Sequence, residues 1–162
     1  MDISPLITNN LLEFLKSHYQ LSWNGLHGFQ HWVRVRENGL RLSTLNGANH
    51  KVVEYFAFTH DIQRKSDGYD PGHGARACKF IRSHLIDHID LTPDEVNLLC
   101  LATSGHTNGK CHPDITISTC WDADRLDLMR AHIRPNPKLL CTPEARDPKI
   151  IEWAIQRSIA TS

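Results

Sequence analysis

The chain has 162 residues, with 18 lysine and arginine residues against 18 aspartate and glutamate residues and 11 histidines. This length suits one domain with a real hydrophobic core, and the formal net charge of +0 gives no general attraction to nucleic acid or to anionic membranes. No apolar run is long enough to span a bilayer, and the first residues, MDISPLITNN, lack the features of a signal peptide.

Helical signals dominate the N-terminal half. Ser4 and Pro5 are a favourable N-cap and first helical residue ahead of the leucines at 11, 12 and 15. Apolar residues at helical spacing predict a second helix over 28–42, in which Gly39 is a weak point. The run VVEYFAF predicts a buried third helix over 50–61, and a fourth is expected over 74–87.

The clearest helix start lies in the second half, where Thr92, Pro93 and Glu95 form a capping-box pattern for a helix ending near Gly105. Further helices are expected over 116–130 and from Asp147 to about residue 160, with the proline-interrupted connector RPNPKLLCTPEARDP between them. We therefore predict an all-α fold of about seven helices in one domain, residues 1–162.

The five cysteines are odd in number and include no C-x-x-C pair. This pattern argues against a disulfide framework and against a structural zinc finger, and it is typical of a reducing compartment. We therefore expect a cytoplasmic protein with no membrane partner and no strong nucleic-acid-binding signal.

Potential metal ligands fall at or just beyond the ends of the predicted helices. They are His27, His31, His60, Asp61, His73, His106 and Asp124. Divalent metals with nitrogen and oxygen ligands need such groups to converge from several elements. The adjacent pair His60–Asp61 ends an apolar helix that would hold it rigidly from behind. An isolated pair of this kind is otherwise typical of a capped helix end.

Three segments together resemble the HD-domain superfamily of metal-dependent phosphohydrolases, whose pattern is H…HD…D on a helical bundle. His31 precedes WVRV as the first histidine of the family precedes its arginine–valine pair, and His60 and Asp61 match the central dyad. Asp124 of ADRL matches the last aspartate. The resemblance covers about residues 25–130, with a C-terminal helix at about 147–160. It implies an HD-domain bundle that holds a metal ion with these four residues.

Helix geometry supports only one carboxylate of DADRLD as a ligand. Asp122 and Asp124 differ by about 200° around a helix and cannot face the same ion. Asp127 lies nearer the Asp124 face and could orient a ligand or a water molecule, whereas we expect Asp122 to be solvated or behind the ligands. His27 stands four residues before His31, a spacing that lets two histidines meet one metal. Because the resemblance makes His31 the ligand, His27 is a candidate for a residue that supports the ligands or faces the substrate, with a surface histidine at the helix start as the alternative.

His73 and His106 raise the question of a second ion. His73 stands at a glycine-flanked helix start, where backbone N–H groups also suit an anion, and His106 lies just past a helix end. Relatives with extra histidines between the dyad and the last aspartate include two-metal enzymes. The resemblance therefore allows a second ion that shares Asp61 and uses His73 and His106. The alternative is one ion, with both histidines contacting substrate phosphate or lining the pocket.

The resemblance implies hydrolysis of a small phosphate ester, with a nucleotide as the leading substrate class. Asp61 is the first candidate base and His27 the second. Of the basic residues near the proposed ligands, we expect Arg64 and Lys65 to meet phosphate, ahead of Arg34 and Arg125.

The proposed ligand set of histidine and aspartate suits manganese, magnesium, cobalt, nickel, iron or zinc. Two alternative functions stay open. One is a diiron oxygenase similar to inositol oxygenase, with the order H…HD…H…H…D. The other is a non-catalytic HD module that binds a metal or a ligand, because a fold alone does not imply activity.

Overall fold

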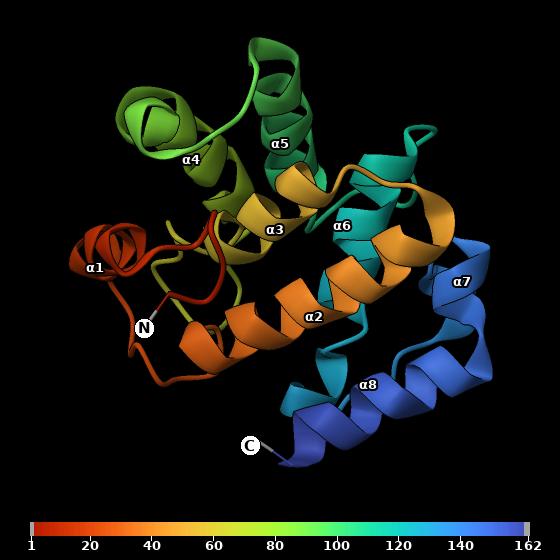
Figure 1. The fold of residues 1–162 in the computed structure, drawn as a ribbon. Coiled ribbons are helices and arrows are strands. Elements are labelled where there is room, and N and C mark those ends of the chain that lie inside the picture. Colours follow the sequence, from red (N-terminus) through yellow and green to blue (C-terminus); the bar gives the residue numbers. More distant parts are fainter. Residues whose placement is uncertain (1, 161–162) are drawn as a thin grey trace.

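The computed structural model describes residues 2–160, which are helical throughout, with connecting turns and loops (Figure 1). The α-helices are α1 (Asn9–His18), α2 (Phe29–Asn46), α3 (His50–Thr59), α4 (His73–Phe80), α5 (Pro93–Gly105), α6 (Ile115–Arg125), α7 (Pro143–Arg146) and α8 (Pro148–Ala160). A π-helical turn follows α4 at Ile81–Leu85, and 3₁₀ turns lie at Ile86–His88, Leu128–Ala131 and Pro137–Leu139. The predicted all-α class is confirmed.

Helices α2 and α3 cross at the centre of the molecule, and α5 and α6 pack against them (Figure 1). Trp32 of α2 and Phe56 and Phe58 of α3 are completely buried in this core. Gly39 lies where α2 meets α3, because a Cβ atom there would stand 2.4 Å from Val53 Cγ1. The residue expected to weaken the helix is thus a point of close helix packing.

Several predicted helix boundaries are wrong. Helix α2 continues to Asn46 instead of ending at residue 42, and α4 ends at Phe80, where a π-helical turn replaces the α-helix expected to residue 87. Helix α1 begins after Thr8, whose Oγ1 accepts the Leu11 N–H at 3.2 Å, while the Ser4 hydroxyl caps a separate turn by accepting the Leu6 and Ile7 N–H groups. Helix α6 ends at Arg125 and not at residue 130. A favourable cap pattern therefore marked a turn at Ser4, and a short 3₁₀ turn replaces the last α-helical turn after α6.

The capping box of α5 is present as predicted. Thr92 Oγ1 accepts the Glu95 N–H at 3.2 Å, and Glu95 Oε2 accepts the Thr92 N–H at 2.9 Å. The two bonds satisfy backbone donors that would otherwise have no partner at the helix start. The helix start predicted from this local pattern is therefore confirmed.

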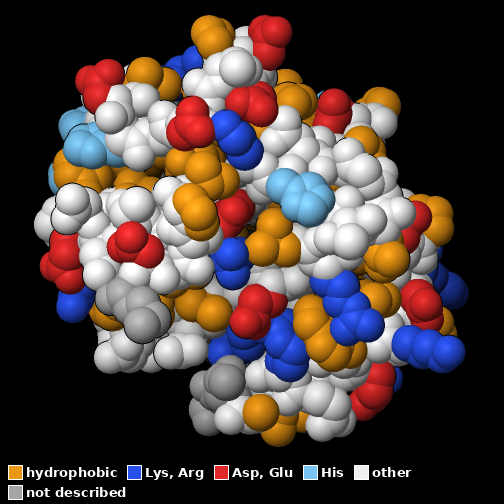
Figure 2. Space-filling view, viewed as in Figure 1, with side chains coloured by type: hydrophobic (Ala, Val, Ile, Leu, Met, Phe, Trp, Pro, Cys, Tyr) orange, Lys and Arg blue, Asp and Glu red, His pale blue; other side chains and the backbone are white. Residues whose placement is uncertain are grey.

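The C-terminal part forms a second hydrophobic cluster, in which α7 and α8 pack on Leu42 of α2 and on Leu126. Asp122 fastens the connector to α6 by accepting the N–H groups of Cys141 at 2.7 Å and of Thr142 at 2.8 Å. Asp122 is fully buried, so the expectation of a solvated side chain is wrong. On the face shown in Figure 2, acidic side chains are interspersed among several basic ones toward α8.

Cys111 and Cys141 are joined by a disulfide across 30 residues, with their Cα atoms 5.4 Å apart. The odd number of cysteines argued against disulfides, and that expectation is wrong for this pair. Whether two cysteines pair depends on which loops meet in the fold and not on whether their number is odd or even. Over residues 2–160, no helix combines the length and the hydrophobicity that crossing a membrane requires.

Candidate metal centre

Helix α3 delivers the His60–Asp61 pair to the interior. Every residue from Val52 to Thr59 is buried, and the two residues that follow are 0% and 2% exposed. The His60 N–H still donates to the Phe56 carbonyl at 3.0 Å, and the imidazole stacks on the Phe56 ring. The apolar helix therefore fixes the position of a polar pair at its end.

A first cluster of potential ligands joins three helices. It consists of His31 in the first turn of α2, His60 after α3 and Asp124 in the last turn of α6. The two histidine Nε2 atoms are 3.1 Å apart, and Asp124 Oδ1 lies 3.3 Å from His31 Nε2 and 3.7 Å from His60 Nε2. The structure thus brings together residues that are far apart in the sequence.

A second cluster lies beside the first and consists of Asp61, His73 and His106. His73 begins α4 and His106 follows α5, and their Nε2 atoms are 2.8 Å apart. Asp61 Oδ1 is 3.1 Å from His73 Nε2 and 3.5 Å from His106 Nε2.

Asp61 also faces the first cluster. Its Oδ2 atom lies 3.6 Å from His31 Nε2 and 3.5 Å from His60 Nε2. One carboxylate therefore stands between the two groups, with one oxygen toward each.

The other ring nitrogen of each histidine fixes its tautomer. His31 Nδ1 donates to Asp127 Oδ2 at 2.7 Å, and His60 Nδ1 donates to the Phe56 and Ala57 carbonyls at 3.2 and 3.1 Å. His106 Nδ1 donates to the Thr103 carbonyl at 2.7 Å, and His73 Nδ1 donates to the Asp70 carbonyl.

Because each proton is on Nδ1, the four Nε2 atoms present lone pairs to one another and to two carboxylates. Such an arrangement is repulsive without a cation between the groups. A backbone carbonyl or carboxylate behind each imidazole is also the usual support of a metal-bound histidine. The donor set therefore fits divalent metal.

Burial and neighbouring charges set the protonation states of the dyad. Burial lowers the pKa of His60 to about 3, which keeps this imidazole neutral. Burial alone would raise the pKa of Asp61, but the surrounding histidines outweigh it and hold that pKa well below its usual value. Asp124 behaves in the same way, with His31 and His60 as its main partners. Both aspartates are therefore ionised beside neutral His60, as metal ligation requires.

Asp127 supports the first cluster from behind. Besides the His31 bond, its Oδ1 atom accepts from Arg34 Nε at 2.8 Å and from the Ser158 hydroxyl of α8. Burial would raise the pKa of Asp127, but His31 and Arg34 outweigh this effect and lower it. The prediction that Asp127 could orient a ligand agrees with this geometry.

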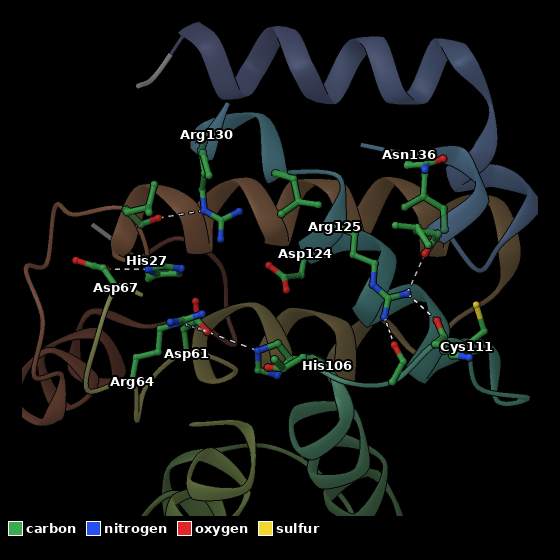
Figure 3. Close-up of a pocket in the computed structure, with 18 of the residues that line it drawn as sticks. His27, Asp61, Arg64, Asp67, His106, Cys111, Asp124, Arg125, Arg130 and Asn136 are labelled. Atoms are coloured by element: carbon green, nitrogen blue, oxygen red, sulfur yellow. Dashed lines mark hydrogen bonds and ion pairs between the residues drawn. The ribbon is translucent and has the colours of Figure 1, made fainter. Parts of the chain in front are cut away.

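The clusters open into a cavity of about 760 Å³, lined in part by His27, Asp61, Arg64, His106 and Asp124 (Figure 3). Ligand pockets for small molecules fall in this size range. His27 precedes α2, so the argument from helical spacing does not apply to it. Its Nδ1 lies 2.8 Å from Asp67 Oδ1, and its ring reaches into the cavity (Figure 3).

No family model matches the sequence, and no curated protein matches it. A crystal structure described as a predicted HD superfamily hydrolase from an uncultured Thermotogales bacterium does match in three dimensions. The two chains are 21% identical, the alignment covers 93% of this chain and 86% of that chain, and the TM-score is 0.69. This chain has the HD-domain fold. The resemblance seen in the sequence is thus confirmed at the level of the fold.

In this HD-domain fold the four basic residues considered as phosphate-binding cations have different surroundings. Arg64 lines the cavity, and its Nε atom lies 3.3 Å from Asp61 Oδ1. Lys65 is exposed and does not line the cavity, and its backbone N–H donates to Asp70 Oδ2 at 2.9 Å. Arg34 is buried against Asp127, and the Arg125 guanidinium binds backbone carbonyls of two loops. Arg125 lines the cavity as Arg64 does, and Arg64 Nη1 also donates to the backbone carbonyls of Ser66 at 2.9 Å and Gly68 at 3.1 Å.

The structure adds residues to the HD-domain pocket that the sequence reading missed. Asp67 orients His27, and Arg130 lines the cavity with its Nε atom donating to the Leu26 carbonyl at 3.1 Å. Lys110, on the loop between α5 and α6, and Lys138, in the 3₁₀ turn Pro137–Leu139, also line the cavity. Asp67 and Arg130 lie within seven residues of predicted ligands, so proximity in sequence was the one signal that could have found them.

Proposed function

We propose that the protein is a metal-dependent phosphohydrolase that acts on a small phosphate ester. The observation that carries the proposal is the pair of clusters, with Asp61 between them, beside a cavity sized for a small molecule. The HD-domain fold supports a hydrolase in general. A nucleotide is the substrate class that we favour, and a cytoplasmic location stays a prediction.

His31, His60, Asp61 and Asp124 would hold one ion, and Asp61, His73 and His106 a second. Bound divalent cations supply a Lewis acid for a phosphoryl oxygen and lower the pKa of a water molecule toward neutrality. Imidazole and carboxylate ligands together suit manganese, iron, cobalt, nickel or zinc, and magnesium at carboxylate-rich positions. The four imidazoles favour the first five of these metals over magnesium.

We assign proton transfer to His27. Both oxygens of Asp61 face histidine Nε2 atoms, which suits a ligand better than a proton acceptor. The Nδ1–H group of His27 donates to Asp67 Oδ1, which leaves Nε2 as the basic atom of a ring that reaches into the cavity (Figure 3). Burial lowers the pKa of His27, so the ring is neutral at pH 7 and can accept a proton.

Two arginines complete the proposed reaction site. Arg64 lies beside Asp61, and Arg130 points toward Asp124 from the other side of the cavity (Figure 3). A guanidinium matches the oxygens of a phosphoryl group in geometry and charge. We propose that they bind the phosphoryl group and neutralise the charge that it gains during hydrolysis.

The test combines metal analysis of the purified protein with a phosphatase screen over nucleotides and other phosphomonoesters. We expect bound divalent metal and phosphate release, with both lost in Asp61→Asn. His50→Gln is the matched control, because His50 is an exposed histidine of α3 outside both clusters. If His60→Ala and Asp61→Ala left metal content and turnover unchanged, the catalytic proposal would fail.

The same ligand order suits two irons, so the oxygenase alternative has a specific observation in its favour. His73 and His106 join Asp61 in one cluster, as the order H…HD…H…H…D requires. Two irons with oxygen consumption and no phosphate release would establish that alternative. Phosphate release without oxygen consumption would eliminate it.

A further inference from the structure

The disulfide Cys111–Cys141 lies in the wall of the metal cavity. Cys111 follows Lys110 on the loop between α5 and α6, and Cys141 follows Leu140 on the connector before α7. Cys111, Lys110 and Leu140 all line the cavity. The bond therefore joins two loops that form one end of the cavity, where Figure 3 places Cys111 beside Arg125.

The two sulfur atoms have different surroundings. Cys111 is exposed, whereas Cys141 is half-buried. Arg125 Nη1 lies 3.3 Å from Cys141 Sγ, and the same guanidinium is held by the carbonyls of Lys110 at 2.8 Å and Leu139 at 3.1 Å. A cation beside a sulfur favours its thiolate, and a thiolate that is stabilised leaves faster in thiol–disulfide exchange. Exposure thus favours attack at Cys111 and departure of Cys141.

The charge of the cavity selects the attacking thiol. Its cationic lining residues are Arg64, Lys110, Arg125, Arg130 and Lys138, and its acidic ones are Asp61, Asp67 and Asp124. Asp61 and Asp124 turn toward histidines and Asp67 toward His27, so the carboxylates are engaged at the metal end. The disulfide end therefore presents Lys110 and Lys138 to a ligand. A small thiol that carries carboxylates fits this end better than a cationic one.

We propose that Cys111 is a modification site that forms a mixed disulfide with a small anionic thiol of the glutathione class. The thiolate of the small molecule attacks Cys111 Sγ and forms the new S–S bond. The Cys111–Cys141 bond breaks, and its electron pair goes to Cys141 as a thiolate beside Arg125. One disulfide is exchanged for another, so the step needs no further oxidant. After protonation, the Cys141 thiol has the Lys110 carbonyl oxygen 3.1 Å away as an acceptor.

Modification of Cys111 would block access to the cavity. A tripeptide attached at Cys111 occupies the space that the two loops enclose, in front of the proposed substrate site. Reduction by a second thiol reverses the change and restores access. This consequence rests on the proposed hydrolase activity, whereas formation of the mixed disulfide does not.

The experiment treats the aerobically purified full chain with glutathione without oxygen, stops the reaction with acid and locates the adduct by peptide mass spectrometry. We expect one glutathione on Cys111 and a free thiol on Cys141, formed at low salt about tenfold faster than with cationic cysteamine. The advantage of glutathione should shrink at high salt because screening weakens the attraction. Where the protein is an active phosphatase, kcat/KM should fall in proportion to the fraction modified.

Two variants separate the site from background reaction. Cys78→Ser removes the half-buried free cysteine, and it should leave the adduct unchanged because the adduct forms on Cys111. The other two free cysteines, Cys100 and Cys120, are buried, and burial raises the pKa of both thiols and keeps them unreactive. Lys138→Gln should slow glutathione but not neutral 2-mercaptoethanol. An adduct on Cys141, equal rates for glutathione and cysteamine, or five free thiols in the untreated chain would each overturn the proposal, whatever the phosphatase result.

Discussion

Asp127→Asn is the sharpest test of how the fold supports the metal centre. The substitution keeps the size of the side chain but replaces one acceptor oxygen with an N–H donor. Asp127 accepts from His31 Nδ1 and from Arg34 Nε at the same time, so an amide in its place can satisfy only one of them. We expect both the stability of the fold and the metal affinity to fall.

The magnitude follows from burial. The Arg34–Asp127 pair has an N–O distance of 2.8 Å and side chains 6% and 1% exposed, whereas the Lys51–Asp90 pair has a similar distance of 2.7 Å and side chains 44% and 76% exposed. Breaking a buried pair costs about 3–5 kcal/mol, and the retained amide oxygen places our estimate near 3 kcal/mol. Asp90→Asn is the matched control, and it should cost below about 1 kcal/mol.

The assay for stability is denaturant unfolding of the metal-free protein, and the assay for metal binding is competition with a chelator of known affinity. Loss of a group that orients a ligand histidine should weaken metal binding by about 10–100-fold. A loss of 3 kcal/mol leaves a domain of ordinary stability folded, so both quantities can be measured. The supporting role would be refuted if Asp127→Asn lowered the unfolding free energy no more than Asp90→Asn does and kept the metal affinity within about twofold of the unsubstituted protein.

Three further outcomes are expected. Gly39→Ala should lower the unfolding free energy by about 1–3 kcal/mol through overpacking against Val53, as denaturant unfolding would show. Adding Val53→Ala to the same chain should recover part of this loss. If the two losses were simply additive, the contact would be contradicted. Hydrogen bonds from Asn49 and from the Thr92 backbone lower the pKa of Glu95 from its usual 4.5, so its contribution is present above that pH and lost as the pH falls through the folded value. Near neutral pH, Glu95→Gln should therefore lower the free energy of unfolding by less than about 1 kcal/mol, and in strong acid it should leave that free energy unchanged. Unfolding curves measured over a pH series test this, and a difference that stays constant with pH would refute it. Removing metal with a chelator should lower the melting temperature, and adding manganese should restore it. Manganese at 100 times its Kd should raise the free energy of unfolding of the metal-free protein by about 2.7 kcal/mol. An unchanged melting curve would exclude a metal bound only by the folded state.

Short-range patterns were sufficient for most of the helices. The capping box at Thr92 and the apolar run of α3 depend on neighbours within a few residues, and both elements lie where the sequence placed them. The same locality explains the error at Ser4, because a favourable cap residue is satisfied equally well by an isolated turn. The extra helix, α7, lies in a connector whose prolines suggested irregular structure.

The sequence by itself determined the helical class, the position of His60–Asp61 at the end of a buried helix and the set of histidines and aspartates that the fold brings together. Only the tertiary structure decided that Asp61 stands between two clusters, that Asp67 hydrogen-bonds His27, that Lys65 does not line the cavity and that Cys111 is bonded to Cys141. The physical reason is range. A helix is set by contacts three and four residues apart, whereas a site depends on the angles at which helices cross and on loops that meet across the whole chain.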